Sequence, residues 1–204
     1  MITIIDYGAG NIKSIKNMLK KIGIESQISR DAEELKKADK LILPGVGHFD
    51  HGMRNLHHAG IVEVLNEKVL NEKTPILGIC LGAQLLGNQS EEGVEKGLAW
   101  IDMDVVRFDP SKLSDRQKIP HMGWNYIERK KDSKLMEGLN DDSRFYFVHE
   151  FHMKVKTAKD ELLSTHYGYE FTSAVERGTI FGTQFHPEKS HKFGMQLLTN
   201  FSKI

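Results

Sequence analysis

Short apolar runs alternate with amphipathic segments through the first half of the chain. Four runs have the length and composition of buried strands, at residues 2–6, 24–28, 40–45 and 75–79. Segments with helical spacing of apolar residues follow them, at residues 11–23, 32–37, 62–73 and 80–89. Strands that alternate with helices predict a parallel sheet covered by helices on both faces.

The pattern changes after Trp100 to short alternating segments separated by tight turns. Residues 173–185 predict a β-hairpin with Arg177 and Gly178 at its tip, and residues 192–201 predict a closing helix. The chain shows no internal repeat and no linker, so one domain over residues 1–204 is expected. The predicted fold class is α/β: an open, mostly parallel sheet flanked by helices, with an antiparallel β extension.

Composition narrows the class of function. Lys plus Arg and Asp plus Glu both total 28, so the net charge of zero gives no support for nucleic-acid or membrane-surface binding. A single cysteine excludes an intramolecular disulfide and fits a reducing compartment. No signal-like start and no stretch approaching the roughly 20 apolar residues of a membrane helix is present, so a cytoplasmic location is expected.

The one cysteine lies in Gly-Ile-Cys-Leu-Gly, where a buried strand should turn into a helix. This is the pattern of a nucleophile elbow, with Cys80 in the place of serine. A strained turn needs neighbours without bulky side chains, which Gly78 and Gly82 supply. The following helix N-terminus favours the thiolate, and the Leu81 N–H would face a developing oxyanion. A buried structural thiol is the alternative.

A thiol nucleophile needs a base and a group that orients the base. His186 and Glu188 stand two apart in "QFHPEKS", where an extended chain would place both side chains on one side. Glu188 would hold the imidazole while the other ring nitrogen faces Cys80. Of the other histidines, His152 is the runner-up base because Glu150 precedes it by two residues.

"LPGVG", residues 43–47, follows a predicted strand and supplies backbone amides for a ligand. The Val46 N–H is the candidate second oxyanion donor. Together with the elbow and the late H-P-E, this order of motifs resembles the class I glutamine amidotransferases over essentially the whole chain. The resemblance implies a Cys80–His186–Glu188 triad and favours the catalytic role of Cys80.

Within that family the chain is similar to the glutaminase subunits of imidazole glycerol phosphate synthases. Four stretches carry the similarity: "DYGAGNIKSI", "LPGVGHF", "GICLGAQLL...SEEG" and "IPHMGWN". The resemblance implies that the substrate is bound by Gly45, Gly47, Gln84, Glu92, Glu150 and Phe151. It places Trp124, Asn125 and Lys189 at the interface with the synthase subunit, and Asn11 as a support for residues 43–47 near it.

The implied reaction is hydrolysis of L-glutamine to glutamate and ammonia, with no cofactor and no metal. Ammonia would pass through a channel into a separate (β/α)8 cyclase subunit, with which this chain would form a heterodimer.

The chain departs from the family at two places. After "YFVH" the family has a small hydroxyl residue and a tyrosine, whereas Glu150 and Phe151 stand here. A carboxylate at position 150 would repel the substrate's α-carboxylate unless it points away. Ala83 and Gly87 replace bulkier residues behind the elbow, so open space is expected there.

The same sequence allows other interpretations. "DYGAGNIK" has Lys13 where a dinucleotide-binding motif needs its third glycine. His48, His51, His57 and His58 fall in an expected loop and helix start, without a metal-ligand pattern, and are expected to be solvated. Two functional alternatives stay open: a paralogous glutaminase that supplies ammonia to a surface-polysaccharide sugar pathway, and a non-catalytic partner-binding subunit.

Overall fold

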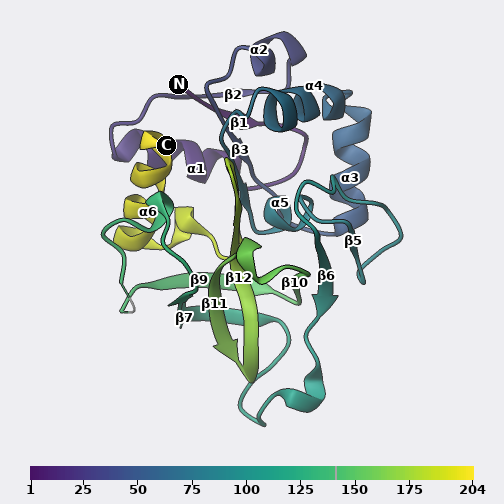
Figure 1. Ribbon diagram of the computed structural model, residues 1–204, viewed down its shortest axis with the longest axis vertical. Coiled ribbons are helices and arrows are strands. Elements are labelled where there is room, and N and C mark those ends of the chain that lie inside the picture. Colours follow the sequence, from purple (N-terminus) through teal and green to yellow (C-terminus); the bar gives the residue numbers. More distant parts are fainter. Residues whose placement is uncertain (141) are drawn as a thin grey trace.

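The centre of the computed structural model, which describes residues 1–140 and 142–204, is a parallel sheet. Its five strands lie side by side in the order β2 (Ser26–Ser29), β1 (Ile2–Ile5), β3 (Lys40–Leu43), β4 (Ile76–Ile79) and β13 (Ile180–Thr183). Each neighbouring pair among them is parallel, which confirms the sequence prediction (Figure 1).

The sheet continues beyond β13 as the predicted antiparallel extension. The added strands are β12 (Tyr169–Arg177), β10 (Phe151–Val155), β6 (Met103–Arg107) and β5 (Gln89–Ser90), with β11 (Glu161–Tyr167) and β8 (Glu128–Arg129) branching from β12. The edge strand β5 pairs with β6 in parallel, whereas the other pairs of these strands are antiparallel. The hairpin of β12 and β13 is confirmed, but Arg177 pairs with Ile180, so its tip is Gly178-Thr179, one residue later than predicted. A separate pair, β7 (His121–Tyr126) and β9 (Arg144–His149), is antiparallel.

Helices cover both faces of the parallel part (Figure 1). One face carries α1 (Ile12–Lys21) and α6 (His191–Lys203); the other carries α2 (Ala32–Lys36), α3 (Phe49–His58), α4 (Val62–Asn66) and α5 (Leu81–Gln84). A π-helical turn extends α4 (η1, Glu67–Asn71), and 3₁₀ turns stand at η2 (Pro110–Lys112), η3 (Lys134–Met136), η4 (Ala158–Asp160) and η5 (Pro187–Lys189). None of the helices in the described ranges has the length and apolar character needed to cross a membrane.

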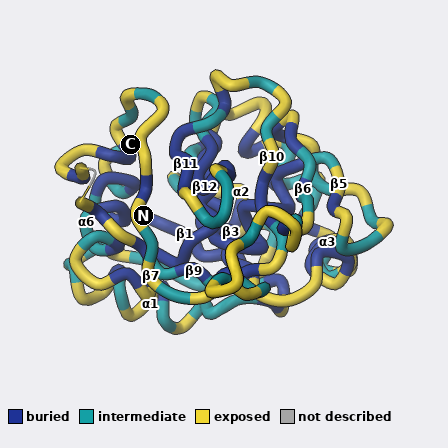
Figure 2. The backbone as a smooth tube through the Cα atoms, turned by 90° about the horizontal axis from the view of Figure 1, so that it is seen from below, coloured by how far each residue is buried: buried dark blue, intermediate teal, exposed yellow. Residues whose placement is uncertain are grey.

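Two hydrophobic cores follow from the alternation of side chains along the strands. Ile2 and Ile4 of β1 join the core under α1 and α6, whereas Ile5 joins the core under α2 to α5. All residues of β1, β4 and β13 are buried, which explains why these strands are almost entirely apolar. Figure 2 shows β1 in the dark blue of buried residues. The carboxyl ends of β3, β4 and β13 lead to Pro44, Cys80 and Gln184, so three separate segments meet at one edge of the sheet.

Candidate active site

Cys80 occupies the turn between β4 and α5 in a strained conformation, with φ of 54° and ψ of −112°. This region of backbone space is unfavourable for any residue with a side chain and is typical of functional turns. A Cβ on Gly78 would lie 2.7 Å from the Ala83 Cα atom, and one on Gly82 would overlap the Leu43 carbonyl. The two glycines therefore allow the tight turn, as the sequence predicted.

Replacing Gly82 with alanine should lower the free energy of unfolding by at least about 3 kcal/mol, because the new methyl group meets backbone that cannot move aside. Urea denaturation measures this effect. The matched control is Gly52→Ala in α3, where the nearest atoms are leucine methyl groups at 3.2 Å that can shift. Equal stability of the two variants would contradict the close approach.

The segment after β3 packs directly on this elbow. A Cβ on Gly45 would lie 2.6 Å from the Gly82 nitrogen, and the Tyr7 hydroxyl donates to the Pro44 carbonyl at 2.6 Å. Gly10 also approaches closely, because its Cβ would lie 2.8 Å from that of Pro44. The Asn11 side chain makes no capping hydrogen bond at the start of α1. Tyr7 and Gly10 thus contact this segment, and the expected support of residues 43–47 by Asn11 stays a prediction.

Two amides are available at the elbow. The backbone N–H groups of Val46 and Leu81 donate no hydrogen bond within the described part of the chain, and both residues line the cavity that contains Cys80. Val46 is 44 % exposed, whereas Leu81 is buried. These are the two residues expected to donate to an oxyanion.

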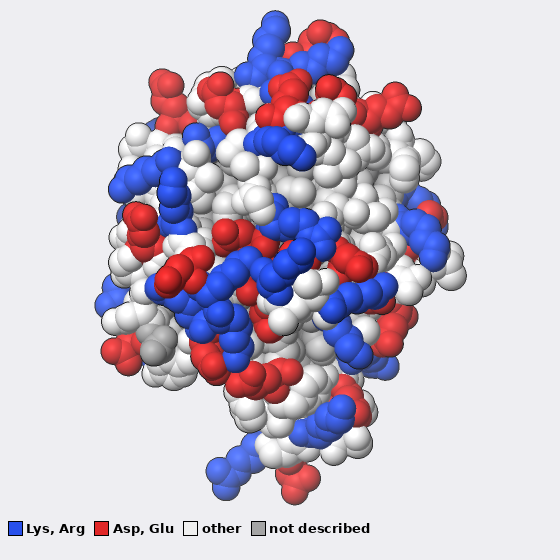
Figure 3. Space-filling view, in the orientation of Figure 1, with Lys and Arg blue, Asp and Glu red and all other residues white. Residues whose placement is uncertain are grey.

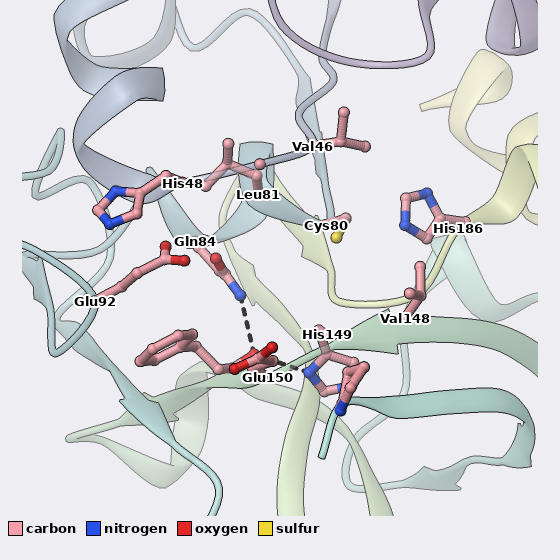
Figure 4. Close-up of a pocket in the computed structure, with 13 residues that line it drawn as sticks. Val46, His48, Cys80, Leu81, Gln84, Glu92, Val148, His149, Glu150 and His186 are labelled. Carbon is pink, nitrogen blue, oxygen red and sulfur yellow. Dashed lines mark hydrogen bonds between the residues drawn. The ribbon is translucent and has the colours of Figure 1, made fainter. Parts of the chain in front are cut away.

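His186 and Glu188 form a buried pair. The His186 Nδ1 atom lies 2.8 Å from Glu188 Oε1, and both residues are buried. Residues 187–189 form the 3₁₀ turn η5, so the expected extended geometry is wrong, although the contact itself is present. The second ring nitrogen, Nε2, is buried and has no hydrogen-bond partner among the described residues. Figure 4 shows the His186 ring beside Cys80 in the cavity.

The electrostatics favour a charged imidazole at this position. Burial alone would lower the pKa of His186, but the neighbouring Cys80 and Glu188 side chains raise it to about 10. An imidazolium between a carboxylate and a thiolate is the arrangement that activates a cysteine nucleophile.

A cavity of about 480 Å³ opens over these groups, within the size range of small-molecule sites. The residues from the sequence prediction that line it are Val46, Gly47, Cys80, Leu81, Gln84, Glu92, Glu150, Phe151 and His186. Gly45 and Glu188 lie behind this lining. Asn11, Trp124, Asn125 and Lys189 do not contribute to it.

Two side chains in the cavity offer oxygen acceptors. The Gln84 Nε2 group donates to the Phe151 carbonyl at 3.0 Å and to Gln184 Oε1 at 3.1 Å, so only its oxygen is available to a ligand. One Glu92 oxygen accepts from the Phe49 N–H at 2.7 Å, and Figure 4 shows this carboxylate directed into the cavity. Such a pair of acceptors suits a cationic group.

Glu150 lines the cavity, and its carboxylate lies 3.6 Å from the Arg107 guanidinium. Both side chains are about half exposed, so solvent weakens the ion pair. The Glu150 carboxylate nevertheless points toward the Arg107 guanidinium. The space expected behind the elbow is absent: Ala83 is fully buried, and a Cβ on Gly87 would lie 2.8 Å from the Met103 carbonyl.

The sequence did not predict the contributions of Gln184, Tyr7 and His149. It also did not predict that His48, Pro120 and Val148 line the cavity. Gln184 is fully buried and donates to the Cys80 sulfur at 3.8 Å. Its position two residues before His186, at the end of a strand, was the available signal. His149 lines the cavity and contacts His121.

Two other histidine predictions have different outcomes. The ring nitrogens of His152 are engaged by the Met153 carbonyl and the Tyr169 hydroxyl, outside the cavity of Cys80, so His152 is not the base. The four histidines of residues 48–58 are exposed as expected, although three lie within α3. No group of three potential metal ligands occurs among residues 1–140 and 142–204.

Buried histidines should make the protein sensitive to acid. Burial lowers the pKa of His121 to about 4 and also lowers the pKa of His149 and His152. Below pH 6.5 the unfolded chain binds protons that the folded chain does not, so the free energy of unfolding falls as the pH falls. His121 alone should contribute a loss of about 3 kcal/mol between pH 6.5 and 4. His186 opposes this loss only near and above pH 6.5, where the unfolded ring loses its proton and the folded ring keeps it; well below pH 6.5 it is protonated in both states and adds no slope.

Urea denaturation at pH 7 and pH 5 tests this prediction. The steep loss should persist in His57→Asn, an exposed control, and should be smaller in His121→Phe. Equal stability of the wild-type protein at the two pH values would contradict the burial of neutral histidines.

Known proteins resemble the chain throughout its length. The family model "Glutamine amidotransferase class-I" matches residues 3–204. Imidazole glycerol phosphate synthase subunit HisH 2 of Pseudomonas aeruginosa is 53% identical over 204 residues, covering 100% of both chains. HisH 2 of Methanococcus maripaludis is 56% identical over 203 residues, covering 100% of this chain and 99% of its own.

A solved structure of a glutamine amidotransferase has the same fold, with a TM-score of 0.72 and 21% identity, covering 100% of this chain and 98% of that one. Sequence similarity over the full length indicates one family, and the strand order and the strained cysteine turn are consistent with it. The chain belongs to the class I glutamine amidotransferases.

Proposed function

We propose that this chain is the glutaminase subunit of an imidazole glycerol phosphate synthase, and that it hydrolyses L-glutamine to glutamate and ammonia as a single amidotransferase domain. The observation that carries the proposal is the meeting of Cys80 and the His186–Glu188 pair at one cavity. Similarity to HisH proteins over the whole chain supports the choice of synthase.

The reaction is an acyl transfer through the cysteine. The Cys80 thiolate attacks the side-chain carboxamide carbon, and the oxygen that becomes negative is placed between the Val46 and Leu81 amides. The His186 imidazolium gives its proton to the departing nitrogen, which leaves as ammonia and produces a γ-glutamyl thioester. Neutral His186 then takes a proton from water, hydroxide attacks the thioester, and glutamate and the thiolate are released.

The cavity suits the main-chain groups of glutamine. Its α-ammonium matches the free oxygens of Gln84 and Glu92. Its α-carboxylate would meet backbone around Glu150 and Phe151, where Arg107 offsets the charge of the Glu150 side chain. The carboxamide is then directed toward Cys80.

An exposed apolar strip on β7 supports the binding of a partner protein at the outer face of this strand. Met122, Trp124 and Tyr126 alternate along the strand and are 62%, 41% and 55% exposed, and Trp124 stacks on His191. Lys189 is exposed beside the Tyr146 ring. The proposed partner is a (β/α)8 cyclase subunit in a heterodimer, reached by ammonia through a channel, because ammonia in water near neutral pH becomes non-nucleophilic ammonium.

The two alternatives have less support. The relatives carry the name of the histidine-pathway subunit, which does not favour the sugar-pathway paralogue. A non-catalytic binding subunit would have no need for the buried His186–Glu188 pair or the strained cysteine.

Glutamate release from glutamine, measured with and without the cyclase subunit and its ribonucleotide substrate, tests the proposal. Strong stimulation by that subunit is the expected result. Covalent labelling of Cys80 by a glutamine-analogue electrophile without stimulation would instead favour a different synthase. Absence of both would contradict the proposed function.

Trp124→Ala should weaken binding of the cyclase subunit by at least about tenfold, because large aromatic side chains dominate interface energetics. Titration calorimetry measures the affinity. Leu70→Ala is the matched control, since Leu70 has nearly the same exposure, 40%, and lies in η1 rather than on β7. Equal affinity of the two variants would exclude β7 from the interface.

A further inference from the structure

Two buried histidines outside the triad lie in direct contact between β7 and β9. His121 and His149 are paired residues of the two strands, and His121 Nδ1 lies 3.0 Å from His149 Nε2. They are 2% and 7% exposed, so solvent does not satisfy their ring nitrogens. Which nitrogen carries a hydrogen must therefore follow from the protein groups around them.

Asn125 determines the hydrogen at one end. Its Oδ1 atom accepts from the Tyr126 N–H at 2.8 Å, and its Nδ2 group donates to the His166 carbonyl at 3.0 Å. These two bonds fix the orientation of the amide and place Nδ2 3.3 Å from His121 Nε2. His121 Nε2 must accept, so it carries no hydrogen. The side chain of Asn125 thus faces inward, unlike that of Trp124.

The Phe151 carbonyl determines the other end. His149 Nδ1 lies 2.8 Å from this oxygen, which can only accept, so Nδ1 carries the hydrogen. In a neutral ring His149 Nε2 is then an acceptor, and His121 Nδ1 must donate to it. Both rings are neutral with hydrogen on Nδ1, and this assignment satisfies all four nitrogens.

The chain of hydrogen bonds continues to the nucleophile. The Phe151 carbonyl accepts a second hydrogen bond, from Gln84 Nε2, as Figure 4 shows by a dashed line. The other Gln84 hydrogen goes to Gln184 Oε1, which fixes the orientation of the second amide. Gln184 Nε2 consequently faces the Cys80 sulfur, at 3.8 Å.

We propose that His121 and His149 are positioning residues for the active site. They hold the Phe151 carbonyl in place, and the two buried glutamines transfer that position to the sulfur of Cys80. This series of hydrogen bonds begins at Asn125, on the strand that carries the exposed Trp124. It therefore also joins the proposed partner surface to the nucleophile. The kinetic part of this inference rests on the proposed glutaminase function.

Among the residues that the structure describes, the two rings have no further hydrogen-bond partner, and their other close neighbours are aromatic. His121 stacks on Phe147 and Tyr167 at 4.8 and 4.0 Å, and Phe108 and Phe171 contact His149 at 5.2 and 5.4 Å. Burial lowers the pKa of both histidines, in agreement with neutral rings. A second proton on either ring would place two N–H groups opposite each other, in the contact between the two rings or in the contact between His121 and Asn125.

The ring hydrogens can be observed directly. Nitrogen-15 NMR of histidine-labelled protein near pH 7, with signals assigned by His121→Phe and His149→Phe, should show hydrogen on Nδ1 in both rings. Free imidazole side chains favour hydrogen on Nε2, so this result is distinctive. Hydrogen on Nε2 of either ring would overturn the proposal, whether or not the protein hydrolyses glutamine.

The effect on the nucleophile can be measured with iodoacetamide, because Cys80 is the only cysteine. His149→Phe should slow alkylation of Cys80 and lower kcat for glutamine by at least tenfold. His152→Phe is the control. His152 has the same aromatic neighbours, Phe108 and Phe171, but makes no hydrogen bond to the residues that connect Asn125 with Cys80. This variant should change both rates less than twofold. Equal rates in the two variants would overturn the proposal.

A conservative pair at His121 separates positioning from packing. Asparagine at position 121 retains a donor near Nδ1, whereas phenylalanine retains the ring shape and removes the donor. Cys80 should be alkylated faster in His121→Asn than in His121→Phe, and the reverse order would contradict the positioning role. If the wild-type protein alkylates but does not hydrolyse glutamine, the proposed function fails while this comparison still tests the positioning role.

Discussion

Replacing Cys80 with alanine should abolish glutamine hydrolysis and leave the fold intact. Loss of the nucleophile removes the thioester route, so turnover should fall by at least about 10⁴-fold. Alanine must adopt the same positive φ as cysteine, and the side chain removed is small, so the free energy of unfolding should change by about 1 kcal/mol or less. Glutamate release and urea denaturation measure the two effects.

Binding of the proposed cyclase subunit is the control for this variant, because the 7% exposed Cys80 has no part in an outer surface. Its affinity should equal that of the wild-type protein. Turnover at the wild-type rate would show that Cys80 is an inert buried thiol, and loss of folding would show that it has a structural role.

Glu188→Gln should lower kcat by about 10²- to 10⁴-fold, as removal of the orienting carboxylate does in related triads. The substituted amide keeps the shape but loses the charge that, together with Cys80, raises the pKa of His186. KM should change little, because Glu188 lies behind the cavity wall. Steady-state kinetics and an NMR titration of His186 measure these effects.

Glu128→Gln is the control for the lost charge, since Glu128 is an exposed carboxylate paired with Lys130. Its kinetic constants should match those of the wild-type protein. An unchanged kcat in Glu188→Gln would show that His186 needs no carboxylate partner.

The parallel half of the fold could be predicted from sequence because its signals are local. Strands buried on both faces are continuous apolar runs, and the helix of residues 12–21 repeats its apolar positions every three or four residues. The helix of residues 49–58 was missed, although Phe49, Met53 and Leu56 are buried at helical spacing, because its histidines suggested a solvated loop.

The triad could also be predicted because its signals are local, whereas the residues that position it could not. Cys80 and the His186–Glu188 pair stand in short motifs, but Gln184 meets Cys80 across 104 positions of sequence. The chain from Asn125 to His149 depends on strand register, which no local pattern specifies. Glu150 turns toward Arg107 because β6 and β10 pair, which again brings together residues far apart in the sequence.

The surface in Figure 3 mixes charges of both signs, so a ligand finds no strong overall field and must be recognised at the cavity itself. Cys80 and His186 line that cavity, and an electrophilic glutamine mimic would reach the same two groups in any enzyme with the same elbow and base. Inhibitor selectivity for this chain must then come from the rim, where Glu150 and Arg107 form an ion pair. A cationic substituent aimed at Glu150 is the feature to add to such a compound.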